Sequence, residues 1–186
     1  MPYVLIDAIG IKKAFIEDRQ TAIDMCQHLW ELAKNRAFFE NSDIKWITFS
    51  DSILISWKAG IIQSGQPLLR WLRSILAEFR VKIGTQLYAI GNQGFEAQPS
   101  ELHDILAVKG DSQCNVNYLH IAGLGDDFAN LYIAEKEISR LRKTSEIPSS
   151  AHIYLHRKLL TDDLLSGKNF FEIKGLSNQN EEFWYF

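Results

Sequence analysis

The chain has 186 residues, 46% of them hydrophobic and 23% charged, which is enough apolar material for one compact core. We therefore expect a single domain spanning residues 1–186. The 20 Lys and Arg residues are balanced by 23 Asp and Glu residues, for a net charge of -3. This balance provides no basic field for nucleic acid or an anionic membrane surface, and neither is expected as a partner.

The first apolar stretch is interrupted by Asp7, Lys12 and Lys13, so it does not resemble a secretory signal. No later run approaches the roughly 20 apolar residues that a membrane span needs. Cys26 and Cys114 lie far apart and form no CxxC pattern, so we expect two reduced thiols. These features predict a cytoplasmic protein.

The first half of the chain alternates β-type apolar runs with segments of helical periodicity. Residues 19–39 and 66–79 repeat apolar side chains every three or four positions, and residues 44–49 and 52–57 are β-rich runs joined by a short polar turn. The predicted elements are a strand at 3–10, a helix at 19–39, strands at 44–49 and 52–57, a helix at 66–79 and a strand at 81–90.

The second half begins with a polar, glycine-bearing surface excursion over residues 91–115. A short helix is expected there around 101–106. The predicted elements after it are a strand at 116–121, a helix at 128–143, a strand at 151–155, a helix at 157–165 and a hairpin formed by 170–175 and 182–186.

The first six elements have the order strand, helix, strand, strand, helix, strand. This order predicts an α/β (α+β) protein with a ferredoxin-like βαββαβ core, its two helices on one face of the sheet. The later strands and helices extend that core.

Two aspartates mark the most informative position in this arrangement. Asp7 lies near the end of the first strand, and Asp51 lies at the tip of the hairpin between the second and third strands. The first and third strands are neighbours in such a sheet, so the two carboxylates should meet at one edge. Paired carboxylates repel unless a cation lies between them, and hard oxygen ligands favour Mg²⁺ or Mn²⁺. The alternative is that both are ordinary strand-end and turn residues, where Asp is common.

Here the sequence resembles a known family. Residues 6–11, Ile-Asp-Ala-Ile-Gly-Ile, are similar to the first-strand signature of the class III nucleotide cyclases, the adenylate and guanylate cyclase homology domain. Residues 48–53 are similar to the family's second metal-binding segment, with Ser50 in place of a glycine. Weaker likenesses follow in the family's order at residues 82–84, at 125–135 and at 174–185. The resemblance covers most of the chain and implies a cyclase-like fold.

The resemblance implies a two-metal reaction. Asp7 and Asp51, with a backbone carbonyl near Ala8, would hold two Mg²⁺ or Mn²⁺ ions while the ribose 3′-hydroxyl of a nucleoside triphosphate attacks the α-phosphorus and pyrophosphate leaves. The amides of Gly10 and Ile11, assisted by Lys12, would bind the phosphates. Glycine and free amides ahead of a helix are suited to that role.

Two departures from the family pattern affect specificity. The positions that usually read a purine base correspond to Ile47 and Ala122, and apolar side chains cannot supply the hydrogen bonds for a purine edge. The chain therefore looks closer to the compact bacterial pyrimidine cyclases of antiphage signalling. They make cyclic UMP or cyclic CMP, which activates a separate effector protein. The choice between UTP and CTP stays open.

The third departure concerns the transition state. The family supplies an Asn and, four residues later, an Arg from a helix of the partner protomer, whereas here Asn130 is followed at that spacing by Ala134. Asn130 and Lys136 are the candidates for this role, although an exposed helix face explains them equally well. The resemblance also implies a head-to-tail homodimer with its sites at the interface.

Two other functions remain open at this point. One is a catalytically silent cyclase-like domain that acts as a nucleotide sensor or an assembly module. The other is an unrelated ferredoxin-like binding protein.

Overall fold

A computed structural model of the chain describes residues 2–39, 41–49, 51–94, 125–166, 169–176 and 178–186. The short helix predicted around 101–106, the strand predicted at 116–121 and the candidate residue Ala122 lie outside this described part. No helix within it is both long enough and apolar enough to cross a membrane.

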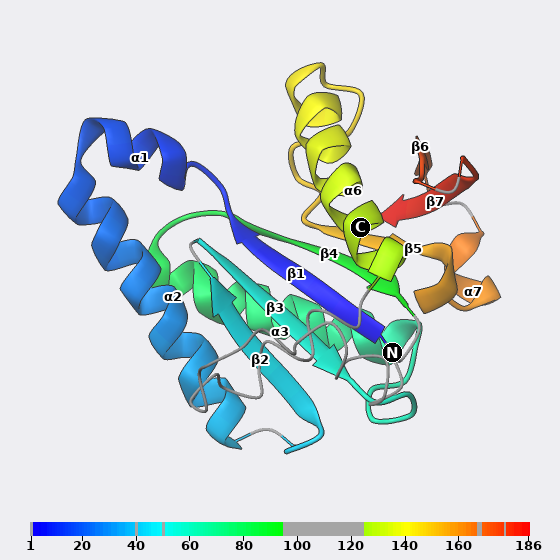
Figure 1. Cartoon of the computed structure of the whole chain (residues 1–186), viewed down its shortest axis with the longest axis horizontal. Helices are drawn as coiled ribbons and strands as arrows, with labels where there is room; N and C mark the ends of the chain where they lie inside the picture. Colours follow the sequence, from blue (N-terminus) through cyan, green and yellow to red (C-terminus); the bar gives the residue numbers. More distant parts are fainter. Residues whose placement is uncertain (1, 40, 50, 95–124, 167–168, 177) are drawn as a thin grey trace, which may run out of the picture.

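The described residues form a mixed α/β structure built on one seven-stranded sheet (Figure 1). Its strands lie in the order β2-β3-β1-β4-β5-β7-β6. The β4–β5 pair is parallel, and every other neighbouring pair is antiparallel. The strands are β1 (Pro2–Ala8), β2 (Ile44–Phe49), β3 (Ser52–Trp57), β4 (Leu87–Gln93), β5 (Ile153–His156), β6 (Phe170–Lys174) and β7 (Asn180–Tyr185).

The helices of the described part lie on both faces of this sheet. Figure 1 shows α3 running behind the strands, α2 running along the β2 side of the sheet, and α6 standing near β5 and β7. The helices are α1 (Ile11–Glu17), α2 (Arg19–Phe39), α3 (Gln66–Ile83), α6 (Gly125–Lys143) and α7 (Asp162–Leu165), with a 3₁₀ turn, η1, at Arg157–Leu159.

The predicted βαββαβ core is observed. The strands β2, β3, β1 and β4 are adjacent and antiparallel, and α2 and α3 pack on the same face, as expected for the core helices. The later helix α6 packs on the opposite face, so the sheet has helices on both sides. Helices on both faces explain why residues 3–6 are all apolar and buried.

Strand β1 lies at the centre of the packing. Val4, Ile6 and Ala8 face α2 and α3, while Tyr3 and Leu5 face α6. Alternate side chains of a strand point to opposite faces, so Asp7 belongs to the α6 face. Burial of this strand on both faces fixes its register, because a one-residue slip would exchange the two sets of side chains.

The predicted boundary between the second helix and the fourth strand is wrong. A strand was expected over 81–90, but α3 continues to Ile83, and β4 begins only at Leu87. Ile83 lies four residues after Phe79 and prolongs the buried stripe of the helix, whereas Val81 is 83% exposed. Residues 82–84, which supported the resemblance to a cyclase strand, therefore form the end of a helix.

Smaller differences occur at other boundaries. The strand predicted at 151–155 is β5 at Ile153–His156, and the helix predicted at 157–165 is divided into η1 and α7. The helix predicted at 128–143 begins three residues earlier, at Gly125. Helix α1 was not predicted as a separate element, since seven residues give little periodic signal.

Substitutions at Gly84 test where α3 ends. It closes the helix with φ at 73°, in the left-handed region, and its amide donates to Arg80 O over 3.0 Å. We predict that Gly84→Val lowers the free energy of unfolding by about 1–2 kcal/mol, because a β-branched residue resists that backbone conformation. Gly84→Asn should cost distinctly less, since Asn tolerates it. Urea unfolding measures both. A Val variant more stable than the Asn variant would instead indicate a strand at this position.

Candidate functional site

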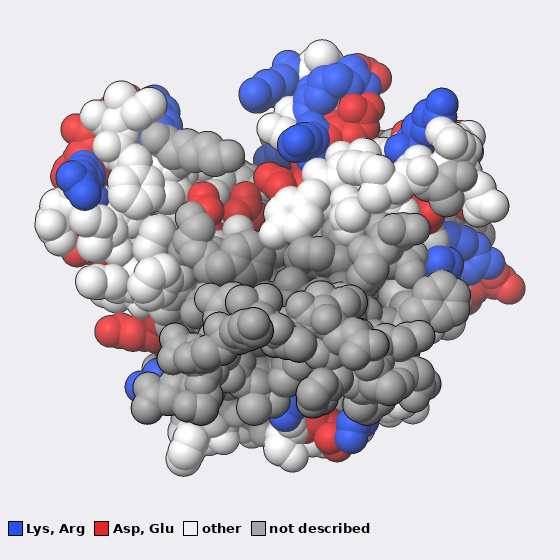
Figure 2. All heavy atoms as spheres, viewed as in Figure 1, with Lys and Arg blue, Asp and Glu red and all other residues white. Residues whose placement is uncertain are grey.

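A cavity of about 270 Å³ lies between the end of β1, the loop that follows it and helix α6. In Figure 2, acidic atoms are visible in the hollow between α1 and α6, and basic atoms lie along α6. Its lining residues come from four parts of the chain: Asp7 to Ile11, Asp51, Tyr88, and Glu135, Ile138, Ser139, Arg142 and Lys143 of α6.

Asp7 is fixed at the inner wall of this cavity by its two neighbouring strands. It is paired with Ser52 of β3 on one side and with Tyr88 of β4 on the other. The Ser52 hydroxyl donates to Asp7 Oδ1 over 2.6 Å, and the Tyr88 hydroxyl donates to Oδ2 over 2.8 Å. Ser52 and Tyr88, which are paired with Asp7 in the two neighbouring strands, thus orient both oxygens of its carboxylate.

Two further carboxylates line the same cavity. Asp51 lies in the turn between β2 and β3, and its carbonyl oxygen accepts from the amide of Ala8 over 3.3 Å, which holds the turn beside the end of β1. Glu135 reaches the site from α6, where its Oε1 lies 3.3 Å from the Tyr88 hydroxyl. The predicted convergence of Asp7 and Asp51 on one end of the sheet is observed, with Glu135 as an additional acid.

Electrostatics at Asp7 reflect this crowding. Burial, followed by the charges of Asp51 and Glu135, raises the pKa of Asp7 from 3.8 to about 6, against the opposing effect of the hydrogen bonds from Ser52 and Tyr88. Burial, followed by the charges of Asp7 and Glu135, raises the pKa of the Tyr88 phenol. The hydroxyl therefore keeps its proton and remains a hydrogen-bond donor. An added positive charge would relieve the repulsion among the acids.

The loop after β1 has a fixed shape. Gly10 adopts φ of 91° at the start of α1, a conformation that favours glycine, and its carbonyl accepts from Ala14 N over 3.0 Å. The amide of Ile9 donates to Gln86 O over 2.8 Å, and Ile9 O accepts from the Thr85 hydroxyl. Gly10 and Ile11, the predicted phosphate-binding positions, line the cavity. The side chain of Lys12 is not among those described.

A basic edge of the cavity was missed by the sequence reasoning. Arg142 is held in place by its hydrogen bonds to Ala151 O at 2.6 Å, the Tyr154 hydroxyl at 2.9 Å and Ser149 O at 3.1 Å. Lys143 is exposed beside it and has no hydrogen bond or ion pair with any described residue. Whether Arg142 and Lys143 reach the cavity depends on how α6 is rotated about its axis against the sheet, and the sequence does not reveal this rotation.

The two transition-state candidates lie outside the cavity. Asn130 is only 2% exposed, and its carboxamide accepts from Leu176 N over 3.0 Å and donates to Glu181 Oε1 over 3.2 Å. Lys136 is exposed on α6. Within this protomer Asn130 therefore joins α6 to the β6–β7 turn, and any role in a partner's site would require it to leave these bonds.

The base-reading candidates give less information. Ile47 is half-buried on the α6 face of the sheet and does not line the cavity. Ala122 lies outside the described residues.

Across the part of the chain that the structure describes, no group of three or more His, Cys, Asp or Glu side chains is arranged to hold a metal ion. Mg²⁺ sites in phosphate-processing proteins commonly use one or two carboxylates and complete the shell with water and substrate phosphates. The two aspartates and the raised pKa of Asp7 fit such a partial site.

Comparisons with known proteins identify no family. A scan against protein-family models gives no match, and a search of curated proteins gives none.

The raised pKa of Asp7 predicts a pH-dependent cost in stability. Between pH 3.8 and about 6 the folded protein binds more protons than the unfolded chain, so stability falls as pH rises through this window. Above about pH 6 the free energy of unfolding is lower by about 3 kcal/mol at most than it would be without this pKa shift. In metal-free buffer, Asp7→Asn should therefore be more stable than the parent above about pH 7, with the difference vanishing near pH 4. Urea unfolding across this range measures the effect.

The control for this experiment is Asp163→Asn, which removes the same charge from an exposed position on α7. Its stability should follow that of the parent at each pH. A destabilising Asp7→Asn change at neutral pH would contradict the electrostatic description of the site.

Asn130 should behave as a structural residue. We predict that Asn130→Ala lowers the free energy of unfolding by about 1–3 kcal/mol, because Leu176 N and Glu181 then lose a buried partner. Lys136→Ala, on the exposed part of the same helix, should change it by less than about 0.5 kcal/mol. Equal effects from both substitutions would argue against this role.

Proposed function

We propose that the protein is a nucleotide cyclase that converts a pyrimidine nucleoside triphosphate, UTP or CTP, to its 3′,5′-cyclic monophosphate and pyrophosphate. The observation that carries the proposal is the convergence of Asp7 and Asp51, remote in sequence, on one cavity together with the Ala8–Ile11 loop. The resemblance of the two segments that contain these aspartates to class III cyclases supports the same chemistry. The cyclic product would serve as a messenger for a separate effector protein, as in antiphage signalling.

The metal requirement follows from the donor set. Asp7, Asp51 and the Ala8 carbonyl would hold Mg²⁺ or Mn²⁺, which when bound neutralises phosphate charge and makes the 3′-hydroxyl more acidic. The hydroxyls of Ser52 and Tyr88 orient the Asp7 carboxylate beforehand. Ionised Asp7 is the form that binds a cation, so metal affinity should weaken below about pH 6.

The loop and α6 contribute to binding of the triphosphate. The amides of Gly10 and Ile11 stand at the start of α1, where the first helical amides have no acceptor within the helix. Helix α1 has only seven residues, so we assign the binding to individual amides rather than to a helix dipole. Lys143 at the cavity edge supplies a mobile positive charge for the polyphosphate.

The proposed enzyme is a homodimer in which each protomer completes the other's site. Lys136 is the better candidate for the group donated across the interface, because its side chain is exposed, whereas Asn130 is engaged within its own protomer. An unpaired protomer would bind substrate without turning it over.

A second function is supported by a specific observation. The engagement of Asn130 with Leu176 and Glu181 favours a catalytically silent cyclase-like domain that senses a nucleotide or promotes assembly. Such a protein would retain metal-dependent nucleotide binding and lack turnover.

Incubation with Mn²⁺ and each of the four labelled ribonucleoside triphosphates tests the proposal. We expect a 3′,5′-cyclic product from UTP or CTP and little from ATP or GTP, because no polar side chain stands at position 47 to read a purine edge. Chromatography against authentic cyclic nucleotides identifies the products. Retention of nucleotide without product would indicate the silent sensor, and neither binding nor product would overturn both functions.

Substitution of the metal aspartates provides the matched test. Asp7→Asn and Asp51→Asn should each lower turnover by at least about 10³-fold while the protein remains folded, because each removes a ligand charge required in the transition state. Asp163→Asn, which removes an equal charge outside the cavity, should retain the parent rate. Parent-level turnover in either active-site variant would contradict the metal assignment.

A further inference from the structure

Arg142 lines the cavity that contains Asp7, on the same face of α6 as Glu135. Seven residues separate the two positions on the helix, which is about two turns and about 10 Å along its axis. Glu135 lies beside the Tyr88 hydroxyl, and that hydroxyl bonds Asp7. The acidic groups therefore gather near the middle of α6, and Arg142 lies about two turns beyond them.

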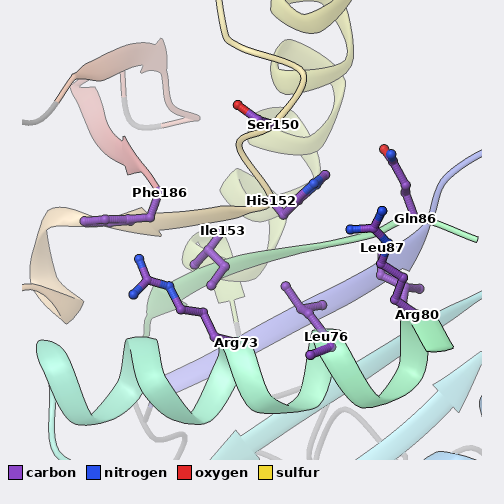
Figure 3. Close-up of a pocket in the computed structure, with 10 residues that line it drawn as sticks. Arg73, Leu76, Arg80, Gln86, Leu87, Ser150, His152, Ile153 and Phe186 are labelled. Carbon is purple, nitrogen blue, oxygen red and sulfur yellow. The ribbon is translucent and has the colours of Figure 1, made fainter.

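The guanidinium group of Arg142 is held by neutral acceptors. Its Nη1 atom donates to Ala151 O over 2.6 Å and to the Tyr154 hydroxyl over 2.9 Å, and its Nη2 atom donates to Ser149 O over 3.1 Å. Figure 3 shows Ser150, which lies between two of these acceptors in the sequence, on the segment that leads from α6 into β5. These bonds restrict the position of the guanidinium without neutralising its charge, because none of the three acceptors is a carboxylate.

A second arginine of the same helix provides the contrast. Arg140 forms ion pairs with Glu137 at 2.7 Å and with Glu146 at 3.0 Å, so its charge is already compensated. Arg142 is half-buried, and its partners among the described residues are the three neutral acceptors. A half-buried cation without a counter-ion favours an anionic ligand in the cavity that it lines.

Two N–H groups of Arg142 remain for such a ligand. A guanidinium has five, and the bonds to the neighbouring segment leave the Nε hydrogen and one Nη2 hydrogen without an acceptor among the described residues. A phosphate can accept more than one hydrogen bond from a single guanidinium, which makes it a suitable partner.

The acidic end of the cavity restricts what this anion can be. Asp7, Asp51 and Glu135 would repel a free anion, so the ligand has to carry positive charge at that end. A polyphosphate with a divalent cation on its inner phosphates meets both conditions. The separation of about two helical turns between Glu135 and Arg142 suits a chain of three phosphates, whose terminal phosphate extends beyond the inner ones.

We propose that Arg142 binds the terminal phosphate of the nucleotide and thereby selects triphosphates over diphosphates. This inference rests on the proposed function, since it requires a metal-bound nucleotide at Asp7 and Asp51. Lys143 supplies a mobile charge at the same edge, whereas Arg142 supplies donors at a fixed place. A diphosphate held by the same cation ends short of these donors and forms fewer charge-assisted hydrogen bonds.

Calorimetry with the full chain, Mn²⁺ and nucleotide analogues measures this selection. The probes are the α,β-methylene analogues of UTP and UDP and those of CTP and CDP, in which the bond that cyclisation breaks is replaced. For the preferred base, we expect the triphosphate analogue to bind the parent about twentyfold or more tightly than the diphosphate analogue. Arg142→Gln should lower this ratio by about tenfold or more, the effect of losing charge-assisted hydrogen bonds to one phosphate.

The matched control is Arg140→Gln, which removes an exposed arginine two residues away that is already paired with carboxylates. Its affinity ratio should stay within about twofold of the parent ratio. Each ratio compares two ligands on one variant. A loss of stability in Arg142→Gln, from the missing bonds to Ala151 and Ser149, therefore affects both affinities alike.

Equal affinity of the parent for the two analogues would refute the role of Arg142 without any variant. A parent-like ratio in Arg142→Gln, or the same loss in Arg140→Gln, would also refute it. Absence of binding by every analogue would overturn this role and nucleotide binding together.

The product assay separates this inference from the cyclase activity. Cyclic product from the parent, with an unchanged ratio in Arg142→Gln, would overturn only the role of Arg142. A lowered ratio in Arg142→Gln, without any cyclic product from the parent, would support that role in a nucleotide sensor and overturn the cyclase.

Discussion

The candidate site depends on a buried carboxylate at the end of the central strand. Asp7 is held by hydroxyl groups from both neighbouring strands, and two more acids approach it from a turn and a helix. A protein gains no stability from such an arrangement, since burial and like charges both disfavour ionised Asp7. Local destabilisation of this kind is typical of a site shaped for a ligand, and the divalent cation that we propose would relieve the repulsion.

The rest of the fold keeps Asp7 in this position. β1 is buried on both faces and paired along its length with β3 and β4. Its register therefore cannot slip without moving the apolar side chains of each face out of their packing. The same register places Ser52 and Tyr88 opposite Asp7. Helix α6 then covers this face of the sheet and brings Glu135, Arg142 and Lys143 to the cavity. The two aspartates thus belong to the sheet and its turn, whereas Glu135 and the basic edge belong to the helix.

The sequence was informative where local pattern and topology agree. The order of the first six elements predicted that β1 and β3 are neighbours, and from this the meeting of Asp7 and Asp51 followed. Tyr88 could not be found in this way, because its contact with Asp7 depends on the β1–β4 register. The end of α3 was misjudged because Val81 and Ile83 imitate a strand, whereas Ile83 in fact prolongs the buried helical stripe. Asn130 matched a family position by spacing alone, and only its partners Leu176 and Glu181 reveal its role within the protomer.

The most direct test of the central claim is anomalous X-ray diffraction from crystals soaked with Mn²⁺ and a non-cyclisable UTP analogue. The account predicts anomalous density for manganese bonded to carboxylate oxygens of both Asp7 and Asp51, with the triphosphate of the analogue completing its coordination. Manganese located elsewhere, or Asp7 still bound only by Ser52 and Tyr88 when the analogue is present, would contradict it.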